Sequence, residues 1–253
     1  MGNRQSRPWI VSDELWSLIE PLLPEPAPKL AEGRPRVPDR QALCGILFVL
    51  HTGIQWEYLP QELGFGSGMT CWRRLAAWNE AGVWDELHLV LLKKLRAAQQ
   101  LDWSRAVIDS PCAGGAARPK SGPSPVDRAR PGSKHHVLTD GQGIPLAVSL
   151  TGGNRNDVTQ LLPLLDQVPA VAGAVGRPRH RPAALLADRG YDHDKYRRPL
   201  WARGIRPVIA ERGEQHGSGL GSFRYVVERT IAWLHGFRRL RIRWERRDDV
   251  HEA

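Results

Sequence analysis

The sequence predicts an α/β protein in which a mixed sheet, covered by helices on both faces, follows a smaller all-helical region. Up to about residue 100, hydrophobic residues recur at helical spacing between turns rich in glycine and proline. After Trp103, the predicted order is strand, two strands as a hairpin, helix, strand, helix, strand and helix. A hairpin combined with strand–helix–strand crossovers indicates one sheet with parallel and antiparallel pairs. The predicted domains are residues 1–100 and 103–253.

The first two helices are predicted from their caps. Ser12 can cap a helix that carries leucine, tryptophan and isoleucine on one side. A proline-rich connector over residues 24–38 leads to a second helix, which we expect Asp39 to cap and Gly53 to end.

The third helix is the candidate DNA reader of the helical region. We expect it to begin at Thr70 and end at Gly82, with Arg73 and Arg74 facing outward, and a fourth helix to cover about residues 83–100. Several short helices joined by sharp glycine turns are typical of a helix-turn-helix-like module. A plain helical bundle with solvated arginines explains the same pattern equally well.

The second region alternates short apolar strands with helices. The predicted strands cover residues 105–110, 134–140, 144–152, 183–188 and 205–210, and the predicted helices cover residues 154–168 and 193–204 and a final segment after residue 222. Residues 117–132 are predicted to be a loop, and the glycine-rich residues 213–222 a link to the final helix.

The charge of the chain favours a polyanionic partner. The formal net charge is +9 and the isoelectric point is near 10, which favours nucleic acid over a membrane surface. The sequence has no secretory signal and no apolar run long enough for a membrane span, so we expect a cytoplasmic, nucleoid-associated protein. Its three scattered cysteines support neither a disulfide framework nor a zinc site.

Three acidic residues stand at positions where they can act together. Asp109 and Asp188 each end a predicted strand, and Glu228 lies in the basic final helix. Taken singly, the aspartates can be turn residues, and Glu228 can pair with Arg224 one helical turn earlier. Taken together, two strand-end acids from neighbouring central strands fall on one edge of the sheet, and a covering helix can add the third.

Three converging carboxylates repel one another unless cations neutralise them. Mg²⁺ suits such a set because it is a hard ion that takes oxygen ligands. Two such ions about 4 Å apart form the standard arrangement for in-line attack at a phosphodiester. The sequence therefore predicts a site for two Mg²⁺ ions at Asp109, Asp188 and Glu228, at which Mn²⁺ can substitute.

Four segments resemble bacterial insertion-sequence transposases of the DDE superfamily, in the insertion-sequence-five-like group. They are "GRPRVPDRQALCGILFVLHTGIQW", "GSKHHVLTDGQGIPLAVSLTGGNRNDVTQLLPLL", "LLADRGYD" and "VVERTIAWLHGFRRLRIRWERR", and the resemblance covers nearly the whole chain. It implies a helical DNA-binding domain followed by an RNase H-like catalytic domain. By this resemblance Asp109, Asp188 and Glu228 are the metal-binding triad, separated by intervals of 79 and 40 residues.

The resemblance also implies the reaction and its partners. The enzyme would cleave DNA at the terminal inverted repeats of its element in the presence of Mg²⁺ and transfer the freed strand to target DNA. We expect double-stranded DNA as the partner and a homodimer in the DNA complex.

A related signature in such enzymes places an arginine four residues before the glutamate and a lysine seven residues after it. Arg224 matches the arginine, and His235 stands in place of the lysine. His235 can instead be a surface residue without a partner. The residues that we expect to contact DNA are Arg224, His235, Arg238, Arg239, Lys134, Arg73 and Arg74.

Two departures from the family pattern keep other functions open. Pro111 and paired glycines interrupt the strand end expected over residues 111–118, and the chain stops at Ala253 where relatives usually continue, so we expect a truncated C-terminus. One alternative is a catalytically decayed remnant that only binds DNA. The other is an RNase H-like nuclease without strand transfer.

Overall fold

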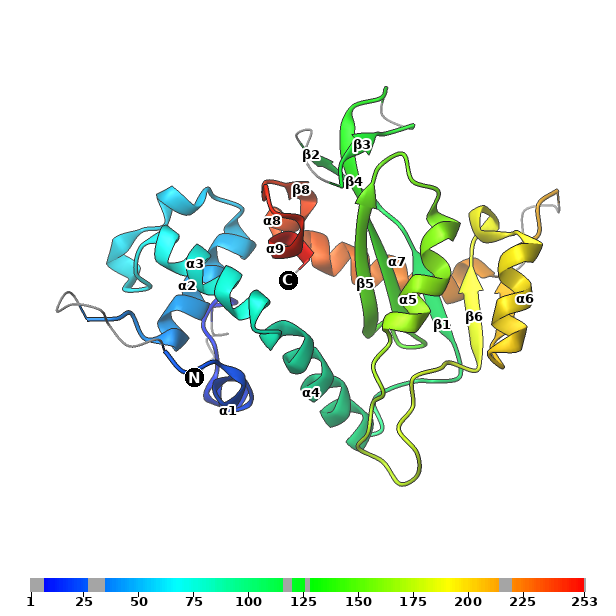
Figure 1. Cartoon of the computed structure of the whole chain (residues 1–253), viewed down its shortest axis with the longest axis horizontal. Helices are drawn as coiled ribbons and strands as arrows, with labels where there is room; N and C mark the ends of the chain where they lie inside the picture. Colours follow the sequence, from blue (N-terminus) through cyan, green and yellow to red (C-terminus); the bar gives the residue numbers. More distant parts are fainter. Residues whose placement is uncertain (1–6, 27–34, 116–119, 126–127, 214–219, 253) are drawn as a thin grey trace, which may run out of the picture.

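The computed structural model describes residues 7–26, 35–115, 120–125, 128–213 and 220–252. Parts of the predicted connector, of the 117–132 loop and of the glycine-rich link lie outside these residues. An all-helical region packs beside a mixed sheet with its own helices (Figure 1). This arrangement confirms the predicted α/β class with a helical N-terminal region.

The helical region contains α1 (Asp13–Ile19), α2 (Asp39–Thr52), α3 (Gly68–Glu80) and α4 (Val83–Ala97), with short 3-10 turns at Glu20–Leu22, Trp56–Tyr58 and Gln61–Leu63. As predicted, the side chain of Ser12 caps α1 by accepting from the Leu15 amide at 3.2 Å. Gly53 ends α2 in the left-handed region at φ 75°, which glycine adopts without a steric penalty. These helices share a hydrophobic core whose fully buried members include Val11, Ala42, Val49, Cys71, Trp78 and Val83.

Two predicted helix starts were wrong. Ser67, not Thr70, caps α3, because its hydroxyl accepts from the Thr70 amide at 3.2 Å. Asp39 is the first residue of α2 and Pro38 holds the cap position, which leaves the Asp39 carboxylate free to pair with Arg74 across the two helices. The Asp39 carboxylate therefore joins α2 to α3 and does not cap its own helix.

The sheet runs in the order β7-β6-β1-β4-β2-β8, with β3 and β5 also paired to β4. Its strands are β1 (Ala106–Asp109), β2 (Cys112–Gly115), β3 (Gly122–Pro123), β4 (Pro131–Asp140), β5 (Pro145–Gly152), β6 (Ala184–Ala187), β7 (Arg206–Ile209) and β8 (Ile242–Arg243). β4 is antiparallel to β1 and β5, whereas β6 is parallel to β1 and β7. The mixed sheet and the β4–β5 hairpin agree with the RNase H-like class that the resemblance implied.

The sequence pattern underestimated the strands around Pro111. β2, which was not predicted, continues the line of β1 along the same side of β4, with Ala113 opposite Ser133. The His135 amide donates to the Pro111 carbonyl at 3.0 Å, so the ladder passes the proline. The pairing with β4 therefore continues past Pro111.

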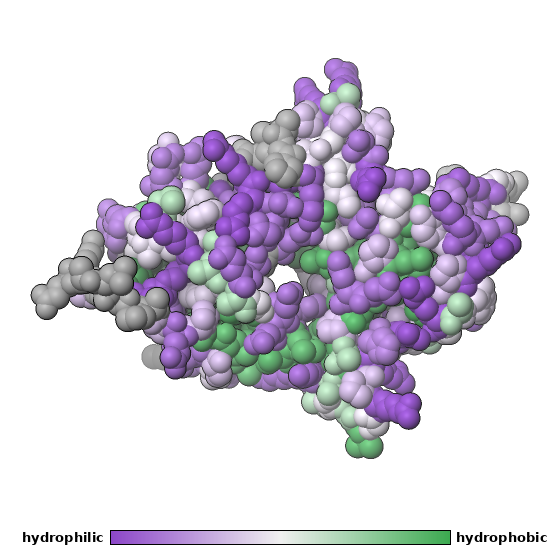
Figure 2. Space-filling model, in the orientation of Figure 1, coloured by the Kyte–Doolittle hydropathy of each residue, from purple (hydrophilic) through white to green (hydrophobic). Residues whose placement is uncertain are grey.

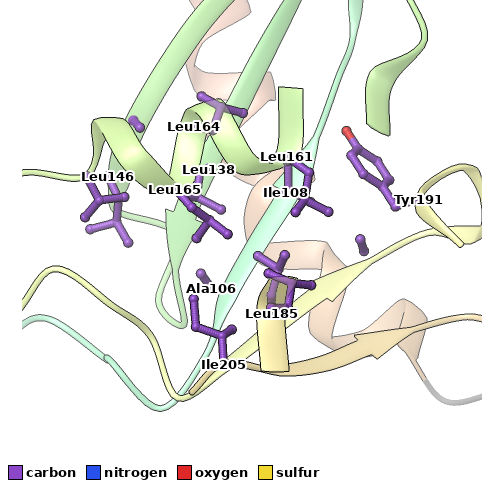
Figure 3. Close-up of a cluster of buried hydrophobic side chains, with 14 of the residues drawn as sticks. Ala106, Ile108, Leu138, Leu146, Leu161, Leu164, Leu165, Leu185, Tyr191 and Ile205 are labelled. Atoms are coloured by element: carbon purple, nitrogen blue, oxygen red, sulfur yellow. The ribbon is translucent and has the colours of Figure 1, made fainter. Parts of the chain in front are cut away.

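Helices cover both faces of the sheet. On one face, α7 (Leu220–Gly236) packs Val227 and Ile231 against β1, β4 and β6. On the other face, α5 (Leu161–Gln167) and α6 (Asp194–Ala202) enclose the largest hydrophobic cluster among the described residues, part of which Figure 3 shows around Ile108 and Leu185. Alternate residues of each central strand point to opposite faces, so both faces are apolar.

The last segment fastens the helical region to the sheet. It comprises α8 (Arg238–Arg241), β8 and α9 (Asp248–Glu252), and we call residues 238–252 the C-terminal strap. β8 adds a parallel strand next to β2, while the Trp56 indole of the helical region donates to Glu245 at 3.1 Å. Figure 1 shows α8 and α9 between the helical region and the sheet.

A cavity of about 330 Å³ lies where α2, the strap and the β4–β5 face meet. Most of its lining is aliphatic or aromatic, with Ile46, Leu47 and Trp84 from the helical region and Val148 from β5. Figure 2 shows a hollow between the helical region and the sheet, bordered in part by hydrophobic residues. Within the described residues, no helix combines the length and the hydrophobicity that a membrane span requires.

Candidate catalytic site

The strand register brings Asp109 and Asp188 to one edge of the sheet. β1 and β6 are parallel neighbours, with Ala106 opposite Leu185 and Val107 opposite Leu186. Asp109 is two residues after Val107, and Asp188 is two residues after Leu186. Both carboxylates therefore leave the sheet at the same level. This edge is the carboxyl end of the two strands, where open sheets place their ligands.

Local hydrogen bonds fix each aspartate. The Ser110 amide donates to Asp109 Oδ1 at 2.8 Å. The Gly190 amide donates to Asp188 Oδ1 at 2.8 Å, so that Asp188 caps the short turn that follows β6. In each case the second carboxylate oxygen faces the guanidinium of Arg224 on α7.

Arg224 places one positive group between the two aspartates. Its Nη2 lies 3.8 Å from Asp109 Oδ2 and 4.0 Å from Asp188 Oδ2. The side chains of Asp109 and Arg224 are 27% and 25% exposed, and that of Asp188 is 41% exposed, so the group opens to solvent. A ligand can therefore reach the carboxylates from the sheet edge.

The electrostatics of Asp109 indicate a site that is short of positive charge. Burial raises the pKa of the Asp109 carboxyl above its usual value, and the nearby charges of Asp188 and Glu228 raise it further. The Ser110 amide and Arg224 act in the opposite direction without cancelling the rise in pKa. All three carboxylates are thus within electrostatic reach of one another.

Glu228 lies on α7, one turn after Arg224, with its side chain exposed. The Arg224 guanidinium pairs with the two aspartates, which does not match the simple i, i+4 ion pair that the sequence left open. The described residues contain no preassembled group of three acidic, histidine or cysteine side chains that could hold a metal ion. The donor set still suits a hard divalent cation, because Arg224 already occupies a cationic position between two carboxylates.

Family models match both parts of this chain. The model described as "Putative transposase of IS4/5 family" matches residues 11–88, and the model described as "Transposase DDE domain" matches residues 101–253. The chain belongs to the DDE transposases of bacterial insertion sequences. The resemblance seen in the sequence is therefore confirmed, and the protein is an enzyme that acts on DNA.

Relatives of this transposase agree with that assignment. The "Putative transposase for insertion sequence element IS402" of Burkholderia cepacia is 62% identical over 149 residues, which cover 59% of this chain and 69% of the relative. The "Insertion element IS402 uncharacterized 16.2 kDa protein" of the same organism is 61% identical over 103 residues, covering 40% of this chain and 70% of that protein. Among solved structures, a match to the Mos1 strand transfer complex covers 83% of this chain and 79% of the Mos1 chain at 10% sequence identity. Its TM-score is 0.28, which is too low to establish a common fold.

DDE transposases generally use divalent metal ions, which suits the carboxylate group of this transposase. Asp109 and Asp188 come from the matched catalytic region, as does Glu228.

Three of the basic residues expected on the DNA-facing surface of the transposase are buried in ion pairs. Arg74 pairs with Asp39, so its predicted outward position was wrong. Lys134 donates to Asp157 at 2.7 Å, and Arg239 donates to Glu245 at 2.6 Å. The burial of these cations requires a carboxylate partner, because an unpaired charge is costly away from water.

The other four expected DNA contacts keep access to solvent. Arg73 on α3 and Arg238 at the start of the strap are exposed, and Arg224 and His235 on α7 are half-buried. His235 is close enough to Arg241 and to His135 for their charges to interact, and burial lowers its pKa below the usual value. His235 is therefore partly buried near other basic groups, and its expected DNA contact stays a prediction.

The sequence did not indicate that these basic residues pair with Asp39, Asp157 and Glu245. Asp39, Asp157 and Glu245 are common acidic residues whose roles depend on contacts 35, 23 and 6 residues away in the chain. His136, which is fully buried beside Ser110, was predicted only as part of the strand over residues 134–140. A signal existed for His136, because strand alternation places it on the same face as the core residue Leu138.

Proposed function

We propose that Asp109, Asp188 and Glu228 are the catalytic carboxylates of this transposase and that they hold two divalent ions, Mg²⁺ in the cell with Mn²⁺ as a substitute. The parallel register of β1 and β6 carries this proposal, because it sets the two aspartates side by side at the ligand-binding edge. The raised pKa of Asp109 supports it, since burial first and the charges of Asp188 and Glu228 second disfavour its ionised form, which a cation at this edge would stabilise.

When bound, the ions would supply positive charge to the attacking and leaving oxygens of a phosphodiester displacement. The residues of the chain hold the substrate around that charge. Arg224, on the helix that also carries Glu228, can contact a phosphate next to the aspartates. Its fork of donors suits a phosphate oxygen better than a lysine would.

The reaction that we infer has two steps at the same carboxylates. First, water attacks a phosphodiester at the end of the element, which leaves a 3′-hydroxyl on the element strand. That hydroxyl then attacks a phosphodiester of target DNA, forms a new 3′–5′ linkage and releases a target 3′-hydroxyl. Both steps are displacements at phosphorus and require no oxidant or reductant.

We further propose that residues 1–100 act as the DNA-binding domain and residues 103–253 as the catalytic domain. Arg73 projects from the exposed face of α3, and Arg224, His235 and Arg238 follow one another along α7 and the strap. With a net charge of +9, the chain suits the terminal inverted repeats of its element and the target DNA. Joining two element ends calls for two copies, so a homodimer in the DNA complex, placed at the nucleoid, completes the proposal.

The test uses duplexes that carry the repeats flanking the coding region of this protein. The purified chain and its Asp188→Ala variant are incubated with these duplexes in Mg²⁺, in Mn²⁺ and in EDTA. We expect nicked and joined products only with metal and only with Asp188. Joined products made by Asp188→Ala would remove this residue from the site.

The two alternatives give other products. Nicking without joining, from substrates that carry a free 3′-hydroxyl, would favour a nuclease. Binding that falls steeply with salt, without cleavage in either metal, would favour a DNA-binding remnant.

A further inference from the structure

A buried chain of hydrogen bonds runs behind the two aspartates. The Tyr191 hydroxyl lies 2.7 Å from Ser110 Oγ, Ser110 Oγ lies 2.6 Å from His136 Nδ1, and His136 Nε2 lies 2.6 Å from Thr151 Oγ1. His136 is 0% exposed and Tyr191 is 2% exposed. The four side chains come from β4, from β5 and from the turns that follow β1 and β6, so the chain crosses four segments.

The hydrogen-bonded side chains are connected directly to the two aspartates. Ser110 follows Asp109 and donates its amide to the Asp109 carboxylate. Tyr191 belongs to the turn that Asp188 caps, and its amide donates to the Asp188 carbonyl at 3.1 Å. The hydrogen bond between the Ser110 and Tyr191 hydroxyls therefore connects the two strand ends that carry the carboxylates.

The donors and acceptors of these four side chains can all be satisfied if the hydrogen bonds run in one direction. Tyr191 donates to Ser110, Ser110 donates to His136 Nδ1, and a proton on His136 Nε2 is donated to Thr151. Thr151 can then donate to the Gly152 carbonyl, whose oxygen lies 3.4 Å away. This order requires a neutral imidazole, and burial together with the charges of Lys134 and His135 lowers the pKa of His136 to about 4.

Apolar side chains surround these hydrogen bonds and hold the bonded groups in place. Tyr191 lies at the edge of the largest hydrophobic cluster, where its ring packs with residues of the Ile108 and Leu161 group (Figure 3). Water cannot readily replace a hydrogen bond in such a setting, so each link restricts the segments that it joins. Removing one link would leave a buried polar atom without its partner.

We propose that His136 is a positioning residue of the transposase, which acts through Ser110 and Tyr191 to hold the Asp109 and Asp188 strand ends at a fixed separation. The two aspartates would then stay at one level of the sheet edge, from which a divalent cation could bind both. This inference rests on the function proposed for the two aspartates. The imidazole acts at a distance, because Ser110 lies between it and Asp109, and the Ser110 and Tyr191 hydroxyls lie between it and the Asp188 turn.

Two substitutions of His136 each keep one of its two hydrogen bonds and remove the other. In His136→Asn the amide can reach Ser110 from the position of Nδ1 but is too short for Thr151. In His136→Gln the longer amide can reach Thr151 from the position of Nε2. Ser110 then loses its bond to residue 136 and keeps only the one to Tyr191. If His136 acts through Ser110, the glutamine variant loses function and the asparagine variant largely keeps it.

The first readout is Mn²⁺ binding by the full chain, measured by calorimetry without DNA. Loss of an outer contact of this kind typically weakens metal binding about 10- to 100-fold. We expect that loss in His136→Gln, Ser110→Ala and Tyr191→Phe, and a smaller loss in His136→Asn. The Mn²⁺ concentration needed for half-maximal cleavage should rise in the same order.

Thr139→Val is the matched control. Thr139 is also buried in β4, and its hydroxyl lies 3.4 Å from the Val107 carbonyl, away from the chain of hydrogen bonds. We expect this variant to change thermal stability without changing Mn²⁺ affinity. A merely structural role for His136 would make His136→Gln behave like this control.

Asp188→Ala separates this inference from the function on which it rests. If Asp188→Ala binds Mn²⁺ like the unaltered protein, the aspartates are not the metal site and the proposed function is wrong. If Asp188→Ala loses binding while folded His136→Gln, Ser110→Ala and Tyr191→Phe keep it, only the positioning role is wrong. Equal losses in His136→Asn and His136→Gln would also overturn the assignment of the Ser110 contact.

Discussion

Arg73 and Arg74 are sequence neighbours with opposite environments. Arg74 is 9% exposed and pairs with Asp39, whereas Arg73 faces solvent from the same turn of α3. Removing the guanidinium leaves the partly buried Asp39 carboxylate, whose side chain is 22% exposed, without its cation. We therefore expect Arg74→Met to lower the free energy of unfolding by about 1 to 3 kcal/mol, as measured by urea denaturation.

Arg73→Met is the matched control for stability and the test for DNA contact. We expect its unfolding free energy to stay within about 0.5 kcal/mol of the original value, because surface substitutions away from special features are nearly neutral. Its DNA affinity should fall, and the slope of log K against log salt should flatten by about one unit if Arg73 contacts a phosphate. An unchanged slope would remove Arg73 from the interface.

The burial and the partners of a residue were harder to predict from the sequence than its place in a strand or helix. The sequence identified Asp109 and Asp188 because each ends an apolar strand, and the register places them side by side. It assigned Arg74 to the surface, although Arg74 lies three residues after Cys71 and four before Trp78, both of which are buried. That spacing predicts the inner face of a helix.

At the scale of elements, α9 packs against the sheet through two histidines. His135 of β4 and His251 of α9 have their Nε2 atoms 2.9 Å apart. Burial is the main cause that lowers their pKa values, to about 4 for His135 and about 3 for His251. The charge of His235 adds to the effect at His135, that of His135 adds to the effect at His251, and that of Arg243 adds to both. The contact therefore favours neutral rings.

The direction of the pH effect follows from these values. The unfolded chain, with a histidine pKa near 6.5, binds more protons than the folded chain below that pH. The stability due to the pair is thus fully present above pH 6.5 and is lost as the pH falls towards 4. We expect a loss of about 2 kcal/mol per histidine between pH 7 and pH 5, measured by urea denaturation at both values.

His251→Gln should remove about half of this pH-dependent loss. The exposed His180 provides the control, because His180→Gln should leave the dependence unchanged. An equal loss of stability in the protein and in His251→Gln would contradict the role given to the pair.

Elements were predicted well where their pattern is local. The β4–β5 hairpin, β6, β7 and the helices α2, α4 and α6 lie close to the predicted ranges. β2 and β8 were not predicted, because β2 consists of small residues and β8 has only two residues, and each becomes a strand by pairing with a distant segment. Sequence periodicity carries no signal for such pairings.

At the scale of the whole molecule, the C-terminal strap makes the two regions interdependent. Glu245 accepts from Arg239 at 2.6 Å and from the Trp56 indole at 3.1 Å, and Arg239 also donates to the Ile54 carbonyl. We expect Glu245→Ala to cost about 3 to 5 kcal/mol, because it leaves Arg239 buried without its anion. In differential scanning calorimetry, we expect one transition for the unaltered protein and two for Glu245→Ala, as the helical region separates from the sheet.

Glu62→Ala, at an exposed glutamate of the helical region, should leave the calorimetric trace unchanged. A single, unshifted transition in Glu245→Ala would show that the strap does not couple the regions.

The strap also has a consequence for synthesis on the ribosome. Trp56 and its partner Glu245 are separated by 189 residues. At about 5 to 20 residues per second, Trp56 is made on the order of 10 to 40 s before its partner in the strap. During that interval the nascent chain can present α3 while the sheet is still incomplete, so a newly made transposase has time to engage DNA close to its own messenger before its two regions are locked together.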